Sequence, residues 1–123
     1  MSVMATTSPA TRATIYHNQR CSTSRKVLAL IEEAGIVPTI VKYLDTPPSR
    51  DGLRKLLDDA GLEPSQAIRT KEAVYKELGL AGASEDELID AMVENPILIE
   101  RPLVVTDRGT VLARPVEKVT SIL

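Results

Sequence analysis

The sequence contains no tryptophan and no phenylalanine, and Tyr16, Tyr43 and Tyr75 are its only aromatic residues. Proteins that bind single-stranded nucleic acids stack bases on aromatic side chains, so this composition argues against that function. The net charge of −2, with both signs mixed, gives no positive surface for DNA or an anionic membrane. With 123 residues, 43% of them hydrophobic, we expect one domain with an aliphatic core and no nucleic-acid or membrane partner.

The sequence is equally poor in cysteine and histidine, with Cys21 and His17 as the only examples. One cysteine excludes an internal disulfide and a cysteine-rich zinc site, so no metal site is expected. No apolar run approaches the roughly 20 residues that span a bilayer. A lone thiol fits a reducing compartment, and we expect a cytoplasmic monomer.

Residues 1–12 are rich in serine, threonine and alanine and lack the long apolar segment of a secretory signal. We interpret them as a flexible N-terminal tail, with a short transit peptide as the alternative. The sequence leaves open whether the genuine start is Met1 or Met4. The folded domain is expected to span residues 13–123.

The first half of this domain alternates strand and helix patterns. Residues 13–17 form a β-rich alternation that predicts a strand, and a helix with serine and threonine caps is expected from Ser22 to a stop at Gly35. A second strand over residues 38–44 and a second helix over about residues 50–60 follow. The two strands should be parallel, because a helical crossover joins them.

The second half begins with a helical insertion over about residues 63–95. Residues 103–106 and 110–113 predict an antiparallel hairpin, and a last helix is expected after Pro115. The order predicts an α/β fold in which helices flank a mixed four-stranded sheet, with the insertion between strands 2 and 3. This is the thioredoxin-like order. Within the insertion, short helical patterns lie around residues 64–68, 72–78 and 84–93.

Cys21 lies directly before the predicted first helix. Free backbone N–H groups at a helix N-terminus, together with the helix dipole, favour an anion and lower the pKa of a thiol there. His17, Arg20 and Arg25 could add positive charge or hydrogen bonds. A buried and unreactive cysteine is the alternative, but the polar neighbours favour a reactive thiolate.

His17, Arg101 and Arg114 each allow two interpretations. His17 is either a polar group at a strand end or a group that lowers the pKa of the thiol, and it has no partners for a zinc site. Arg101 directly precedes a proline and a predicted strand, and Arg114 ends the second strand of the hairpin and also precedes a proline. A guanidinium beside a thiolate suits a tetrahedral oxyanion, whereas ordinary surface charge is the alternative.

Five motifs resemble those of the glutaredoxin- and glutathione-coupled arsenate reductases, a thioredoxin-like family related to the Spx-like proteins. The resemblance covers residues 13–123, with the motifs in the family's order, and implies a thioredoxin-like fold with a helical insertion. The motifs are His17-Asn18-Gln19-Arg20-Cys21-Ser22-Thr23-Ser24-Arg25, Tyr43-Leu44-Asp45-Thr46-Pro47-Pro48, Tyr75-Lys76-Glu77-Leu78-Gly79-Leu80, Asn95-Pro96-Ile97-Leu98-Ile99-Glu100-Arg101-Pro102 and Ala113-Arg114-Pro115.

The resemblance also implies roles for single residues. Cys21 would be the nucleophile that attacks arsenate, and His17 would help to stabilise its thiolate. Arg69, Arg101 and Arg114 would bind the anion, and the choice of Arg69 rests on the resemblance alone. The residues expected to support the site are Pro102, as the cis-proline beside the cysteine, Ser24 and Arg25.

Reduction of arsenate to arsenite requires two electrons, and a single thiol cannot form an internal disulfide. The second thiol must therefore come from outside the chain. The resemblance identifies it as glutathione, a co-substrate, with glutaredoxin as the protein that resolves the mixed disulfide, and it implies no tightly bound cofactor. There are two departures from the family. Gln19 stands where proline is usual, which should loosen the loop, and the chain lacks the longer C-terminal extension of some members.

Two other functions stay open. Spx-like regulators bind RNA polymerase, but they commonly carry a Cys-x-x-Cys switch, and Cys21-Ser22-Thr23-Ser24 lacks the second cysteine. The other possibility is a related thiol-dependent reductase with a different substrate, such as a glutathione adduct.

Overall fold

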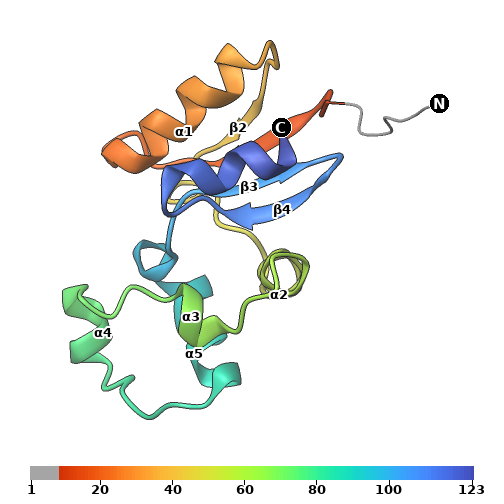
Figure 1. Cartoon of the computed structure of the whole chain (residues 1–123). Helices are drawn as coiled ribbons and strands as arrows, with labels where there is room; N and C mark the ends of the chain where they lie inside the picture. The colour runs from red at the N-terminus through yellow and green to blue at the C-terminus, as the bar shows by residue number, and fades with distance from the viewer. Residues whose placement is uncertain (1–8) are drawn as a thin grey trace.

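The computed structural model describes residues 9–123 and is built around a four-stranded sheet (Figure 1). The first two strands are parallel, and the other neighbouring pairs are antiparallel. This confirms the predicted mixed sheet, its parallel first pair and its C-terminal hairpin. The strands, in the order β2-β1-β3-β4 across the sheet, are β1 (Ala13–Tyr16), β2 (Thr39–Val41), β3 (Leu103–Thr106) and β4 (Gly109–Leu112).

Helix α1 (Ser22–Glu33) connects β1 to β2 and ends where the sequence predicts. Gly35 adopts a φ of 82°, a conformation that favours glycine. This lets the N–H of Ile36 donate back to the carbonyl of Ile31 at 3.3 Å and close the helix end.

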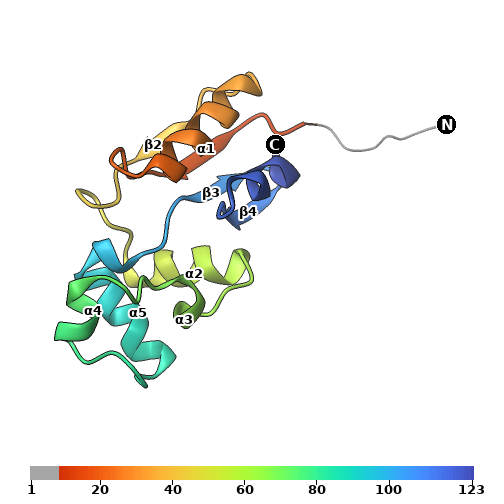
Figure 2. The same ribbon diagram turned by 60° about the vertical axis from the view of Figure 1, so that its left-hand side comes forward.

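The helical insertion contains three short helices, which confirms the three sequence patterns. With the preceding helix they form a group that lies apart from α1 in Figure 2. The Ser84 hydroxyl accepts from the N–H of Glu87, whose carboxylate accepts from the N–H of Ser84, so a capping box starts the last of them. The elements are α2 (Arg50–Asp59), α3 (Pro64–Ala67), α4 (Ala73–Glu77), α5 (Glu85–Glu94) and the 3₁₀ turn η1 (Pro96–Leu98).

Side chains alternate between the two faces of the sheet, and each face contributes to a separate part of the core. Ile15 and Val104 pack with α1 and with the C-terminal 3₁₀ helix η2 (Val116–Ile122). Leu103 packs on the other face with α2, α3 and α5. Both parts of the core are mainly aliphatic, as predicted.

Three sequence predictions differ from the structure. Strand β2 is shorter than predicted, because the carbonyl of Lys42 accepts from the N–H groups of Asp45 and Thr46 and turns the chain. The last helix, η2, is a 3₁₀ helix in a segment rich in β-branched residues, which restrict side-chain rotation in an α-helix. The predicted hydroxyl caps of α1 are absent, because Cys21 itself is the N-cap residue.

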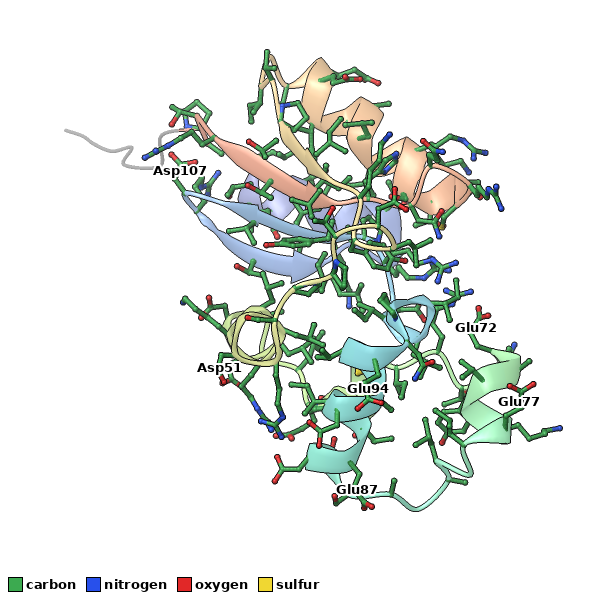
Figure 3. All side chains as sticks on the ribbon, turned by 180° about the vertical axis from the view of Figure 1, so that it is seen from behind. Asp51, Glu72, Glu77, Glu87, Glu94 and Asp107 are labelled. Carbon is green, nitrogen blue, oxygen red and sulfur yellow. The ribbon has the colours of Figure 1, made fainter. Side chains whose placement is uncertain are left out.

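The end of the predicted N-terminal tail is bound to the domain. The N–H of Ala10 donates to the carbonyl of Leu123 at 3.0 Å, and the N–H groups of Thr11 and Arg12 donate to the carboxylate of Asp107. Asp107 lies at the turn between β3 and β4 (Figure 3). Residues 10–12 of the predicted tail are therefore hydrogen-bonded to the domain, whereas residues 1–8 lie outside the described part, and the flexibility of the tail stays a prediction.

Residues 9–123 include no helix that is both long and apolar enough to cross a membrane.

Candidate active site

Three loops at one edge of the sheet bring most of the predicted site residues together. The end of β1 pairs with the start of β3, which in turn pairs with the end of β4. Cys21 follows β1, Arg101 precedes β3 and Arg114 follows β4. Antiparallel pairing therefore places all three at the same edge, although 93 positions separate Cys21 from Arg114 in the sequence.

The sulfur of Cys21 faces a guanidinium that the backbone holds in place. Cys21 is half-buried, and its N–H donates to the carbonyl of Asn18 at 3.0 Å. Nη1 of Arg114 lies 3.8 Å from the sulfur. The same nitrogen donates to the carbonyl of Arg101 at 3.0 Å, so β4 and the segment before β3 position it jointly.

The pKa of the Cys21 thiol lies below its ordinary value, although burial acts in the opposite direction. The N–H of Ser24 is the main group that lowers this pKa, followed by the side chains of Arg101 and Arg114 and then by the N–H of Thr23. The side chain of Cys21, the N-cap residue of α1, forms no capping hydrogen bond of standard geometry, so these amides act on the sulfur through their dipoles. The site therefore favours a thiolate.

Alkylation of Cys21 by iodoacetamide should report this pKa, because only the thiolate reacts. The rate is expected to rise with pH through a midpoint below the value of about 8.5 for a free thiol. Replacing Arg114 by alanine should move the midpoint upward, because the thiolate loses a neighbouring cation. A wild-type midpoint at or above that of a free thiol would contradict the lowered pKa.

His17 contacts the first turn of α1. Its Nδ1 lies 2.6 Å from the hydroxyl oxygen of Ser24, which also accepts from the N–H of Asn18 at 3.2 Å. Burial, and then the positive charges of Arg25 and Lys42, hold the pKa of His17 below its ordinary value. With its pKa below the ordinary value, His17 is mainly neutral at pH 7. Its contact with Ser24 connects it to the residue whose N–H lowers the pKa of Cys21. Its role in stabilising the thiolate stays a prediction.

The loop that contains Gln19 is held by side chains on both sides. Nη1 of Arg25 donates to the carbonyl of Gln19 at 2.9 Å. The N–H of Arg20 donates to the side-chain oxygen of Asn18, also at 2.9 Å. Arg25 therefore supports the loop before Cys21, and the two bonds hold the loop on either side of Gln19.

Arg69 is connected to Arg114 through a carboxylate. Nη1 of Arg69 lies 2.5 Å from Oε1 of Glu100, and Nε of Arg114 lies 3.7 Å from the same oxygen. Arg69 also pairs with Glu72 at 3.0 Å. The backbone N–H of Arg69 donates to the carbonyl of Leu98, which fixes the residue beside the segment before β3.

Two buried polar atoms near the site have no hydrogen-bond partner among residues 9–123. They are Nε of Arg101 and the hydroxyl oxygen of Tyr43. Burial raises the pKa of Tyr43, and the positive charge of Arg101 opposes that rise. A buried donor without a partner is costly, so an anion that reaches Arg101 would satisfy a group that the protein leaves free.

The peptide bond between Arg101 and Pro102 is cis, as the resemblance implies, and the bond between Arg114 and Pro115 is also cis. Pro102 is buried, and it directly precedes the first residue of β3.

Sequence reasoning missed Tyr43 and Glu100 as members of the site. Tyr43 is only 1% exposed, and its place after β2 gives no sign that its hydroxyl is buried near Arg101. Glu100 could have been found, because it is a charged residue next to Arg101 at the end of an apolar stretch. In the described part of the chain, no group of three histidine, cysteine or acidic residues is arranged to hold a metal ion.

Comparison with known proteins shows which protein family this chain resembles. Residues 16–122 match the model of the ArsC family. An arsenate reductase of Rhizobium meliloti (strain 1021) is 54% identical over 89% of this chain and 80% of its own length. The uncharacterized protein YfgD of Escherichia coli (strain K12) is 47% identical over 89% of this chain and 94% of its own.

Comparison with solved structures also finds an arsenate reductase. The arsenate reductase of Vibrio cholerae superposes with a TM-score of 0.88 at 47% identity, and the match covers 93% of this chain and 99% of that one. The mixed sheet with its flanking helices is thus the thioredoxin-like fold that the resemblance implied. On the extent of these matches, the chain belongs to the ArsC family.

Proposed function

We propose that this protein is an enzyme that reduces arsenate to arsenite through the Cys21 thiolate, with glutathione as the external thiol and glutaredoxin as the protein that resolves the mixed disulfide. The observation that carries the proposal is the contact between a low-pKa thiol at a helix N-terminus and the guanidinium of Arg114, 3.8 Å away. The names of relatives at about 50% identity support arsenate as the substrate.

The geometry suits attack on a tetrahedral oxyanion. The sulfur of Cys21 would bond to arsenic, and one arsenate oxygen would leave as water after protonation. Arg101 and Arg114 would neutralise the remaining oxygens, because a guanidinium presents paired N–H donors to paired oxygens. The first amides of α1 would add donors for the charge that develops. Arg69 would act beside Arg114, to which Glu100 already links it.

The electrons balance only with an outside thiol. Arsenic acid and two thiols give arsenous acid, one disulfide and one water. The chain supplies one thiol, Cys21. The sulfur of glutathione would attack the sulfur of Cys21, and the sulfur–arsenic bond would break with its electron pair passing to arsenic. Glutaredoxin and a second glutathione would then reduce the mixed disulfide, so no tightly bound cofactor is needed.

A second candidate is a thiol-dependent reductase of another substrate. It is favoured by the match to YfgD, which has nearly the length of this chain and carries no assigned activity. A coupled assay with glutathione, glutaredoxin and NADPH-linked glutathione reductase tests the choice. We expect arsenate to drive NADPH consumption and arsenite to accumulate. If arsenate caused no NADPH consumption, the proposal would be contradicted. If the protein also bound RNA polymerase, the Spx-like alternative would be favoured.

Glu100 is expected to control the affinity for the oxyanion. Its carboxylate lies against Arg69 and Arg114, so it opposes an incoming anion. Replacing Glu100 by glutamine should lower the KM for arsenate about threefold, which is the size of one partly exposed charge interaction. Glu94→Gln, an exposed substitution on α5, is the matched control. A higher KM for arsenate in Glu100→Gln would contradict this role.

In the cell, we propose that the enzyme works as a monomer in the cytoplasm, where glutathione keeps thiols reduced.

A further inference from the structure

A cavity of about 250 Å³ lies beside the Cys21 loop. One wall is formed by residues 17–20, which directly precede Cys21. The other wall is formed by Lys42, Leu44 and Asp45, which follow β2. The cavity lies toward β2, whereas Arg101 precedes β3 and Arg114 follows β4, and β1, which leads to Cys21, lies between β2 and β3.

We propose that this cavity binds the γ-glutamyl arm of the glutathione molecule that reduces the Cys21-bound intermediate. The inference rests on the proposed function and adds a place for the co-substrate. The oxyanion would occupy the side of Cys21 with Arg101 and Arg114. The external thiol would then approach the sulfur of Cys21 from the side of β2.

The charges of the cavity match those of this arm. Arg20 and Lys42 are cations and Asp45 is a carboxylate, and all three side chains are exposed. Within the described residues, none of the three takes part in a salt bridge. The γ-glutamyl arm carries one carboxylate and one ammonium group. Its carboxylate would pair with Arg20 or Lys42, and its ammonium group with Asp45. The exposed side chain of Leu44 offers apolar contact to its methylene groups.

The size of the cavity limits the proposal to one arm. Ligand pockets that hold a whole small molecule commonly measure about 300–1,000 Å³. A cavity of about 250 Å³ is below this range and can hold one terminal residue of a tripeptide. The cysteinyl residue of glutathione follows the γ-glutamyl arm, just as Cys21 follows Arg20 in the cavity wall. Because Arg20 lines the cavity and directly precedes Cys21, an arm bound there would leave the thiol beside the loop that carries Cys21.

The test compares three thiols under single-turnover conditions without glutaredoxin. Glutathione and γ-glutamylcysteine contain the γ-glutamyl arm, whereas cysteinylglycine lacks it. Each thiol is added at increasing concentration to the enzyme with excess arsenate, and mass spectrometry follows the mixed disulfide on Cys21. Wild-type enzyme is expected to half-saturate at a concentration at least about fivefold lower with the first two thiols than with cysteinylglycine.

Lys42→Ala and Asp45→Asn should raise the half-saturating concentration of glutathione and γ-glutamylcysteine about fivefold each. They should leave that of cysteinylglycine and the affinity for arsenate unchanged. Lys26→Ala removes an exposed cation of α1 outside the cavity and is the matched control, with all values at wild-type level. Circular dichroism checks that each variant is folded.

Equal effects of Lys42→Ala on all three thiols, or no effect on any of them, would overturn the subsite. Equal use of cysteinylglycine and glutathione by the wild-type enzyme would do the same. If the wild-type enzyme forms no mixed disulfide with any thiol in the presence of arsenate, the proposed function itself is wrong. The two failures are therefore distinguishable.

Discussion

Cys21→Ser is expected to abolish arsenate reduction that depends on glutathione and glutaredoxin. A serine hydroxyl stays protonated at neutral pH and cannot form the disulfide that carries the two electrons. No other cysteine can replace it, because the chain has only one. The rate in the coupled assay should fall by more than about 10³-fold, to the background without enzyme.

The substitution should leave the fold intact, since serine has nearly the shape of cysteine and Cys21 is only half-buried. Thermal unfolding followed by circular dichroism checks this point. Ser22→Ala, at the exposed neighbouring position in the first turn of α1, is the matched control and should keep its activity. Arsenate reduction by a folded Cys21→Ser enzyme would eliminate the thiolate mechanism.

Arg114→Ala is expected to lower kcat/KM for arsenate about 10²–10³-fold, the usual cost of removing one group that stabilises an oxyanion. Nη1 of Arg114 lies 3.8 Å from the sulfur, and Arg114 would also bind the arsenate oxygens. Arg114→Lys should recover part of the loss, because it restores the charge but not the paired N–H donors of a guanidinium. Steady-state kinetics with varied arsenate measures both variants.

Arg108→Ala is the matched control for this effect. Arg108 is an exposed arginine at the turn between β3 and β4, at the opposite end of the strands from Cys21. The control removes the same charge from the protein and should keep wild-type kinetics. If Arg108→Ala and Arg114→Ala had equal effects, net charge alone would explain the loss, and a specific role for Arg114 would be wrong.

Arg101→Lys gives a complementary result for the buried arginine. Arg101 is 8% exposed, and its Nε has no partner among the described residues. Lysine keeps the charge and much of the length, so the fold should hold, whereas the second donor needed for a bidentate contact is lost. We expect kcat/KM for arsenate to fall and the half-saturating concentration of glutathione to stay unchanged.

Local sequence signals were sufficient for much of the fold. The pattern of Ser84 and Glu87 predicts the start of α5 because both partners of the capping box lie within one turn. Gly35 predicts the end of α1, because glycine readily adopts the positive φ that ends a helix. Antiparallel pairing of β1 with β3 then places Cys21, which follows the end of β1, near the start of β3.

Predictions failed where tertiary contacts decide the structure. β2 is an edge strand with one neighbour, so nothing extends its pairing beyond Val41. The bond between His17 and Ser24 depends on how α1 begins, which apolar spacing does not reveal. The link from Arg69 through Glu100 to Arg114 joins residues from three segments of the chain. The family resemblance alone selected Arg69, because no local pattern separates it from the surface arginines.

The central claim is that Cys21 is one half of a redox couple whose other half is an external thiol. Intact-mass spectrometry of the enzyme with arsenate, before and after glutathione is added, tests it most directly. Without glutathione, we expect no free arsenite. With glutathione and no glutaredoxin, one glutathione should become attached to Cys21 for each arsenite released. Release of arsenite from the enzyme and arsenate alone, or turnover with no glutathione ever bound to Cys21, would contradict the account.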